Sequence, residues 1–430
     1  MIETSVQQHA PVRQLSMFGM WLLIANGMIG AGIFGVPAEA ARLAGAFSPW
    51  IFMLCAVLIF PIMLCFAELA SYFRSSGGPV AYATAAFGKA AGFQAGWALY
   101  FGRTTAFAAN ANLLVSALPL LSGVTAAPAV RVIMLFAICA GLTWLNVRSA
   151  RGTIQWLGAL TTMKLVPLLV LAGFGLWRFA PGSIPLAIPS GRNLGAATVV
   201  IIYGFMGFES GPVAAGEARD PQRDIPRALM AALLVCAILY TLIQWAAVAA
   251  VPTLATSGRP LVDAATALMG NTGTILLTVG VIVSVGGNLT SNMFTIPRIT
   301  YRLAQDQCLP KWFGTIHPLY QTPVWSIVFF GALCFLLAVT GSFAWLAGLS
   351  VVIRLLLYLL CISGMPRIRV RLAQVTESWR LPAGGWITAI AAGECLSLLT
   401  QVTVRTLLFS ALFLVAGSIL FIAAKETERR

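Results

Sequence analysis

Long apolar runs constrain this chain more than any other feature of its sequence. Stretches of about 20 predominantly apolar residues recur along the chain, each long enough to cross the ~30 Å hydrocarbon core of a bilayer as an α-helix. Of the 430 residues, 59% are hydrophobic and only 9% are charged, whereas about 25% of the residues in a soluble domain are charged. The sequence therefore predicts an all-α polytopic membrane protein.

The breaks between these runs divide the chain into twelve predicted membrane spans. They cover residues 15–45, 48–73, 90–121, 128–147, 152–178, 194–217, 228–251, 273–301, 323–341, 343–364, 384–402 and 404–424. With the amino terminus in the cytoplasm, eighteen of the 27 Lys and Arg residues fall on the cytoplasmic side and six on the outer side. Cytoplasmic loops of membrane proteins carry such an excess. We therefore expect a multi-pass protein of the cytoplasmic (inner) membrane with both termini in the cytoplasm. The net charge of +14 then reflects orientation in the bilayer, and no nucleic acid partner is expected.

The first span is interrupted at its centre by the stretch ANGMIGAGIFGVP, residues 25–37. It contains four glycines and ends in a proline, and each interior Gly costs a helix ~0.8–1 kcal/mol relative to Ala. The sixth span is interrupted in a similar way by Gly204, Gly207, Gly211 and Pro212. We expect both helices to open at these places, because proline also removes a backbone donor.

Paired interruptions of this kind indicate a transport site. Irregular backbone at membrane depth is tolerated only where it lines a cavity or is buried in protein. An opened helix offers unpaired N–H groups, which suit a carboxylate, and unpaired carbonyl groups, which suit an ammonium. Corresponding broken helices in two halves of a chain are therefore a pointer to substrate binding. The alternative is that the glycines only allow helices to pack closely.

Four segments, in order along the chain, resemble the amino acid–polyamine–organocation (APC) family of transporters. They are GMIGAGIFGVP (27–37), FAELASYFRSSGGPVAYATAAFG (66–88), GFMGFESGPVAAGEARDPQRDIPRA (204–228) and RLAQDQCLPKWFGTIHPLYQTP (302–323). The resemblance extends over roughly residues 15–364. It implies a leucine-transporter-like fold with two inverted repeats of five helices, broken helices 1 and 6, and transport by alternating access.

This resemblance divides the chain into five parts. They are a cytoplasmic amino-terminal tail (1–14), a first repeat with helices 1–5 (15–178), a second repeat with helices 6–10 (194–364), helices 11 and 12 (384–424) and a cytoplasmic carboxy-terminal tail (425–430).

The resemblance also implies a substrate site at the two interruptions. The expected substrate-binding residues are Met28, Ile29, Gly30, Ala31, Gly32, Ile33, Tyr203, Phe205 and Met206. The N–H groups that begin at Ala31 are expected to hold the substrate carboxylate, and carbonyl groups of both helices are expected to face its ammonium. The ring of Tyr203 takes the position of a gate over the substrate. Many relatives have Ser in place of Ala31, so this chain lacks one hydroxyl ligand.

Two charged residues within the spans are candidates for gating and proton coupling. Lys164 lies near the middle of span 5, and the resemblance implies that its ammonium replaces the sodium ion of sodium-coupled relatives by bonding to carbonyls near Gly27–Gly30. The alternative is that Lys164 extends to the cytoplasmic interface. For Glu209, the resemblance implies coupling of the inner gate to substrate occupancy, through protonation. The alternative is that Glu209 caps the second half of helix 6.

The sequence leaves the roles of three further polar residues within the spans open. Arg103 reads an acidic or polar substrate side chain, pairs with a carboxylate such as Glu394 or Glu209, or faces an inner vestibule. Asn288 either lines the cavity and contributes to specificity or joins helices by hydrogen bonding. Arg354 in span 10 has no assigned role.

The expected function is secondary active transport of amino acids by a permease that is independent of sodium and is either a proton-coupled symporter or an exchanger (antiporter). The apolar residues at the interruptions favour neutral substrate side chains unless Arg103 reaches the site. Alternatives are an amino acid exporter, an amine or polyamine antiporter, and, in a different class, a transporter-like amino acid sensor.

The sequence predicts no enzyme. It has two histidines and no C-x-x-C pair, so no catalytic residue, metal site or cofactor is expected. The expected partners are the amino acid or amine substrate, a proton as coupling ion and the lipid bilayer. We expect one chain to contain the whole pathway, so a monomer is sufficient for transport. A dimer is also possible.

Overall fold

The computed structural model describes residues 15–30, 32–73, 77–117, 128–148, 157–179, 187–374 and 379–429. Regular structure in these ranges is helical, apart from a single β-bridge between Leu15 and Ala218. Seven helical segments of the described residues are long and apolar enough to span a membrane, and three shorter apolar helices accompany them. The predicted all-α polytopic membrane protein is confirmed.

Most predicted spans correspond to a single helix. These helices are α3 (Ser48–Tyr72), α5 (Lys89–Ala117), α7 (Pro128–Arg148), α8 (Leu157–Arg178), α11 (Pro221–Ala250), α14 (Val324–Thr340), α15 (Phe343–Arg371), α16 (Gly384–Thr400) and α17 (Val404–Arg429). Short helices join them: α4 (Pro79–Phe87), η1 (Gly45–Phe47), η3 (Leu254–Thr256) and η4 (Lys311–Gly314).

The first and sixth spans are each divided into two helices, as the sequence predicts. In the first span, α1 (Met17–Met28) ends before Ile29, and α2 begins at Gly32 and runs to Ala44. Ala31 lies outside the described residues. In the sixth span, α9 (Gly191–Phe205) and α10 (Ser210–Val213) are separated by residues 206–209, and a 3₁₀ turn, η2 (Ala215–Glu217), follows. Gly207 has a φ of 110°, a conformation that favours glycine.

Two elements differ from the sequence prediction. Helix α12 (Pro260–Thr295) begins well before residue 273, because a short amino-terminal helix joins the predicted span across a kink at Gly270, where φ is 63°. The span then continues into α13 (Pro297–Gln305). Helix α4 occupies residues for which the sequence predicts only a loop between spans.

Helix contacts follow the pattern expected of two related repeats. The first span contacts the sixth through α2 and α9, the second contacts the seventh through α3 and α11, and the fourth contacts the ninth through α7 and α14. The third span (α5) also contacts the tenth (α15). If the two repeats are exchanged, the equivalent contact is between the eighth span (α12) and the fifth (α8), and this contact is present as well. The exact boundaries of the repeats stay a prediction.

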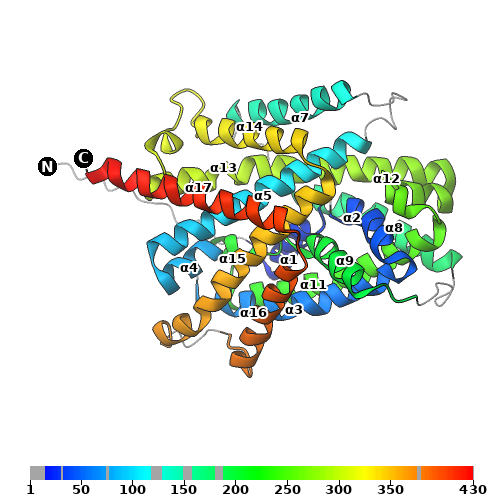
Figure 1. Ribbon diagram of the computed structural model, residues 1–430, viewed down its shortest axis with the longest axis horizontal. Coiled ribbons are helices and arrows are strands. Elements are labelled where there is room, and N and C mark those ends of the chain that lie inside the picture. Colours follow the sequence, from blue (N-terminus) through cyan, green and yellow to red (C-terminus); the bar gives the residue numbers. More distant parts are fainter. Residues whose placement is uncertain are drawn as a thin grey trace.

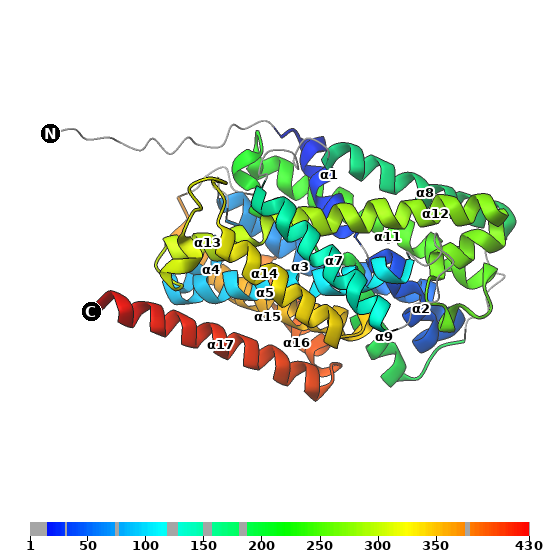
Figure 2. The same cartoon turned by 90° about the horizontal axis from the view of Figure 1, so that it is seen from above.

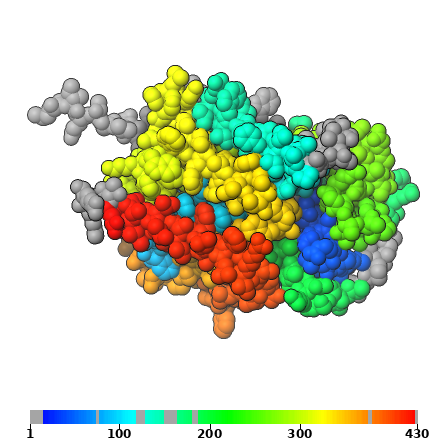
Figure 3. Space-filling view, turned by 45° about the horizontal axis from the view of Figure 1, so that its top comes forward, coloured from blue at the N-terminus to red at the C-terminus, as the bar shows by residue number. Residues whose placement is uncertain are grey.

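The helices run roughly along the long axis of the molecule (Figure 1). Helix α4, helix α13 and the carboxy-terminal end of α17 lie toward one end, whereas α2, α9 and the start of α12 lie toward the other (Figures 1 and 2). Helices α16 and α17 both contact α15, and α17 crosses the surface beside α14 (Figure 3). Its outer side carries exposed apolar residues: Leu408, Leu412, Val415, Ile419 and Ile422. This face is suited to lipid.

Candidate functional site

The two interruptions lie against each other at the centre of the molecule. A Cβ atom on Gly27 would overlap the carbonyl oxygen of Gly207, and one on Gly207 would overlap the carbonyl of Gly27. A Cβ atom on Gly32 would lie 2.8 Å from the Cα atom of Gly204. The glycines therefore lie where the helices open, and they also allow backbone to pack against backbone.

Lys164 on α8 bonds to the first interruption. Its Nζ atom donates to the carbonyl oxygen of Ile29 at 2.6 Å, to the carbonyl oxygen of Asn26 at 3.0 Å and to Oδ1 of Asn26 at 2.5 Å. The residue is 2% exposed. The alternative that Lys164 extends to the interface is wrong, because its ammonium is held inside the protein by the carboxy-terminal end of α1.

The carbonyl groups expected to face the substrate ammonium differ in whether they already accept hydrogen bonds within the protein. The Met28 carbonyl accepts from the Tyr240 hydroxyl at 3.0 Å and from the Gly30 N–H at 2.9 Å, which uses both of its lone pairs. The carbonyls of Phe205 and Met206 accept no hydrogen bond from any residue in the described ranges.

On α2, the N–H groups of Gly32 and Ile33 belong to the first helical turn and have no intrahelical acceptor. The close approach of Gly32 to Gly204 brings these donors near the end of α9. Backbone donors of one helix and backbone acceptors next to the other therefore lie in the same region of the molecule, around the contact of Gly32 with Gly204.

A chain of polar side chains crosses the site between three helices. The Tyr203 hydroxyl donates to Oδ1 of Asn110 at 3.0 Å, and Nδ2 of Asn110 donates to Oδ1 of Asn288 at 2.8 Å. Asn292 donates to the same Asn288 oxygen at 2.7 Å. Asn110 and Asn292 are not among the site residues predicted from the sequence, although asparagine within an apolar span is a signal that could have found them. Both roles expected for Asn288 are compatible with this position, because it joins helices and also lines a cavity.

Glu209 is at the centre of a buried cluster of charges. Its carboxylate is fully buried, and Oε1 lies 3.3 Å from a guanidinium nitrogen of Arg103 and 3.6 Å from Nε of Arg354. Its other oxygen, Oε2, accepts from the Gly207 N–H at 3.0 Å and from the Tyr358 hydroxyl at 3.1 Å. The cluster connects α5, the interrupted span and α15.

This cluster bears on the open interpretations of its residues. Glu209 directly precedes α10, but its side chain makes no capping hydrogen bond there, and its roles in gating and at the helix end stay predictions. Arg103 pairs with Glu209 and not with Glu394, whose Oε2 has no hydrogen-bond partner among the described residues. Arg354, which had no assigned role, belongs to the same cluster.

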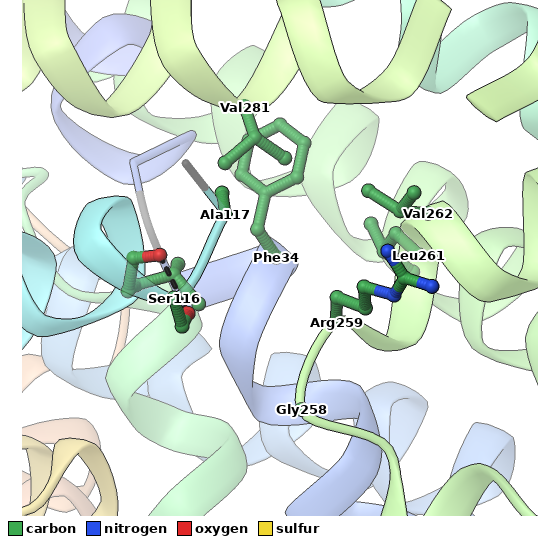
Figure 4. A pocket seen from close by; sticks show the side chains of 9 residues that line it. Phe34, Ser116, Ala117, Gly258, Arg259, Leu261, Val262 and Val281 are labelled. Atoms are coloured by element: carbon green, nitrogen blue, oxygen red, sulfur yellow. Dashed lines mark hydrogen bonds between the residues drawn. The ribbon is translucent and has the colours of Figure 1, made fainter. Parts of the chain in front are cut away.

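The pathway is open on one side of the interruptions and closed on the other. A cavity of about 470 Å³, here called the inner cavity, extends from the interruptions toward α13. Its lining includes Asn26, Gly27, Arg103, Ser210, Glu217, Asn288, Asn292 and Arg298. On the opposite side, the outer pocket between α2, α5 and α12 holds only about 10 Å³ (Figure 4). Phe34, Ala117, Arg259 and Val281 line this pocket, and the ring of Phe34 points toward Val281 (Figure 4). The ring of Phe343 also closes this side, because it fills the space beside Gly35 and packs edge-on against Tyr203.

Several known proteins that are similar in sequence to this chain are transporters. The amino acid permease family matches residues 15–424. An uncharacterized transporter of Mycobacterium tuberculosis is 27% identical over 343 residues, which cover 79% of this chain and 76% of that protein. The serine/threonine exchanger SteT of Bacillus subtilis is 25% identical over 85% of each chain. A vacuolar cationic amino acid transporter of Arabidopsis thaliana is 27% identical over 77% of this chain and 59% of that protein. The chain therefore belongs to the amino acid permease family, as the resemblance to APC transporters implied, and the protein is an amino acid transporter of the membrane and not an enzyme.

Proposed function

We propose that the protein is a secondary active transporter that moves amino acids by alternating access. The free carbonyls of Phe205 and Met206, opposite the free N–H groups of Gly32 and Ile33, are the observation that carries this proposal. An α-amino acid has an ammonium and a carboxylate on one carbon, so it can pair with both sets at once. The structure then corresponds to the conformation in which the outer pocket is closed and the inner cavity is open.

Sodium independence is the second part of the proposal. The Lys164 ammonium satisfies oxygen atoms of α1 that a bound cation would otherwise coordinate. With that place occupied by a fixed positive charge, the driving force is a proton gradient or exchange of one amino acid for another. The name of SteT, a serine/threonine exchanger, favours exchange as a starting point for experiments.

For the substrate, the proposal is an amino acid with a neutral side chain. The site contains Phe205, Met206 and the ring of Tyr203, which offer apolar contacts, and amide groups such as that of Asn288. The two arginines beside Glu209 repel a cationic side chain, which disfavours lysine and arginine as substrates. An exporter or an amine antiporter is the competing proposal. The proposed location is the cytoplasmic membrane, with both termini and the inner cavity on the cytoplasmic side, and a monomer as the transporting unit.

Two measurements together test the proposal. A thermal-shift screen of the purified protein against the common amino acids and simple amines should reveal substrates, because a ligand that binds only the folded state raises its apparent stability. Each hit is then assayed for uptake into proteoliposomes. Stabilisation without uptake or exchange would favour a sensor, and stabilisation by amines alone would favour the amine antiporter.

A further inference from the structure

The cluster around Glu209 carries more positive than negative charge. Arg103 and Arg354 each contribute a guanidinium, which stays charged in proteins, whereas Glu209 contributes the only carboxylate that approaches either of them within 4 Å among the described residues. Their side chains are 13% and 4% exposed. An unneutralised charge at such a depth is costly, and buried charges are normally paired.

The arginines also lack hydrogen-bond acceptors. Within the described ranges, neither guanidinium donates a hydrogen bond, and both Nε of Arg354 and Oε1 of Glu209 are buried without a hydrogen-bond partner. The ion pair of Glu68 with Arg369 provides a comparison within the same protein. There, the guanidinium donates to both carboxylate oxygens, at 2.7 and 2.8 Å. The Glu209 cluster is therefore loosely paired, and guanidinium N–H groups of Arg103 and Arg354 remain without acceptors among the described residues.

Some of these unused guanidinium N–H donors belong to a residue that lines the inner cavity. Arg103 lines the inner cavity beside Leu99 and Ser210, so a ligand entering that cavity can reach its guanidinium. Arg103 and Asn110 are seven residues apart on α5, which is about two helical turns or ~10 Å. Arg103 therefore lies inward of the polar chain that joins Tyr203, Asn110 and Asn288.

We propose that the inner cavity contains an anion-binding subsite formed by Arg103, with Arg354 behind it, which accepts a carboxylate or a monovalent anion of similar size. The anion completes the charge balance of the cluster and accepts the unused guanidinium N–H groups. Two sources supply such a group: the side-chain carboxylate of an acidic amino acid that enters the cavity, or a free anion such as chloride. Guanidinium groups recognise both by charge-assisted hydrogen bonds. Glu217 and Arg298, which have opposite charges, also line this cavity.

The experiment uses the full-length protein in detergent and measures its melting temperature in titrations at constant ionic strength. In the first arm, chloride and acetate each replace gluconate. In the second arm, glutamate is compared with glutamine, and aspartate with asparagine, in gluconate. If the source is a free anion, chloride and acetate raise the melting temperature in a saturable way. If the source is a side-chain carboxylate, glutamate or aspartate stabilises at lower concentration than its amide.

Arg103→Gln is expected to weaken the anion effect roughly tenfold or more, since it removes hydrogen bonds from a charged donor. Arg103→Lys keeps the charge and should retain a measurable effect, which covers the case in which Arg103→Gln does not fold. Arg131→Gln is the matched control. Arg131 is also a half-buried arginine that faces α5, but it donates to Oδ1 of Asn112 at 2.6 Å and lies outside the cavity lining.

The inference is overturned if neither anions nor the acid–amide comparison affect the wild-type protein, or if Arg103→Gln changes neither response. It does not depend on the identity of the transported amino acid. If neutral amino acids still stabilise the protein and are transported, failure of the anion arms removes the subsite and leaves the proposed function intact.

Discussion

The Nζ atom of Lys164 lies 2.6 Å from the carbonyl oxygen of Ile29, the residue at which the first span opens. This bond connects α8 to the end of α1, and the same ammonium also satisfies both oxygens of Asn26. The break in the first span is therefore held by a charged side chain from another helix.

Replacing Lys164 tests this role. We expect Lys164→Met to lower the free energy of unfolding by about 1.5–3 kcal/mol, because hydrogen bonds to a charged group are lost and the oxygens of α1 stay buried. Transport should fall with it. Lys89→Met, at an exposed lysine, serves as the control and should behave as wild type. The readouts are denaturation in detergent and uptake into proteoliposomes.

Sodium dependence gives a separate prediction. If the Lys164 ammonium replaces a metal cation, uptake by the wild-type protein should be unchanged when choline replaces sodium on both sides of the membrane. A steep dependence of the initial rate on sodium concentration would contradict this role. The ionic strength has to stay constant, since screening alone affects charged substrates.

Glu209→Gln is expected to affect both stability and transport. The substitution leaves two buried guanidinium groups without a counter-charge, and breaking a buried ion pair in this way costs about 3–5 kcal/mol. We expect a lower melting temperature and a changed dependence of uptake on pH. Glu39→Gln breaks a more exposed ion pair with Arg42, which is worth ~0–1 kcal/mol. A Glu209→Gln protein with wild-type stability and kinetics would show that the carboxylate is dispensable.

Gly27→Ala tests the contact between the two interruptions. The added Cβ would overlap the backbone oxygen of Gly207, and backbone cannot move aside as a flexible side chain can. We expect severe loss of uptake, by roughly tenfold or more if the strain reaches the 1–3 kcal/mol typical of overpacking. Gly141→Ala, on α7, meets no atom within 4 Å and should leave uptake unchanged.

Tyr203→Phe removes the bond to Asn110 but keeps the ring that packs on Phe343. Loss of one hydrogen bond of ~1 kcal/mol should shift the balance between closed and open outer pockets about fivefold toward the open form. The measurement is labelling of Val281→Cys, at a position that lines the outer pocket and is buried when that pocket is closed, by a membrane-impermeant thiol reagent. The eight native cysteines are buried, which keeps the background low. Equal labelling rates with and without the Tyr203 hydroxyl would show that its hydrogen bond to Asn110 does not stabilise the closed outer pocket.

The sequence by itself determined the helical membrane class, the two broken spans and the residues at which they break. The physical reason is local: apolar length decides whether a helix can cross a bilayer, and glycine and proline decide where it opens. Lys164 and Glu209 were also identifiable, because a charge within an apolar span requires a partner.

Only the tertiary structure decided which partners these charges have. The pairing of Glu209 with both Arg103 and Arg354 joins residues separated by more than 100 positions in the sequence, and no periodicity in the sequence encodes such a contact. The roles of Asn110 and Tyr240 depend in the same way on how α5 and α11 pack against the interrupted spans. Which side of the pathway is open is likewise a property of packing, since it depends on where the side chains of several helices meet.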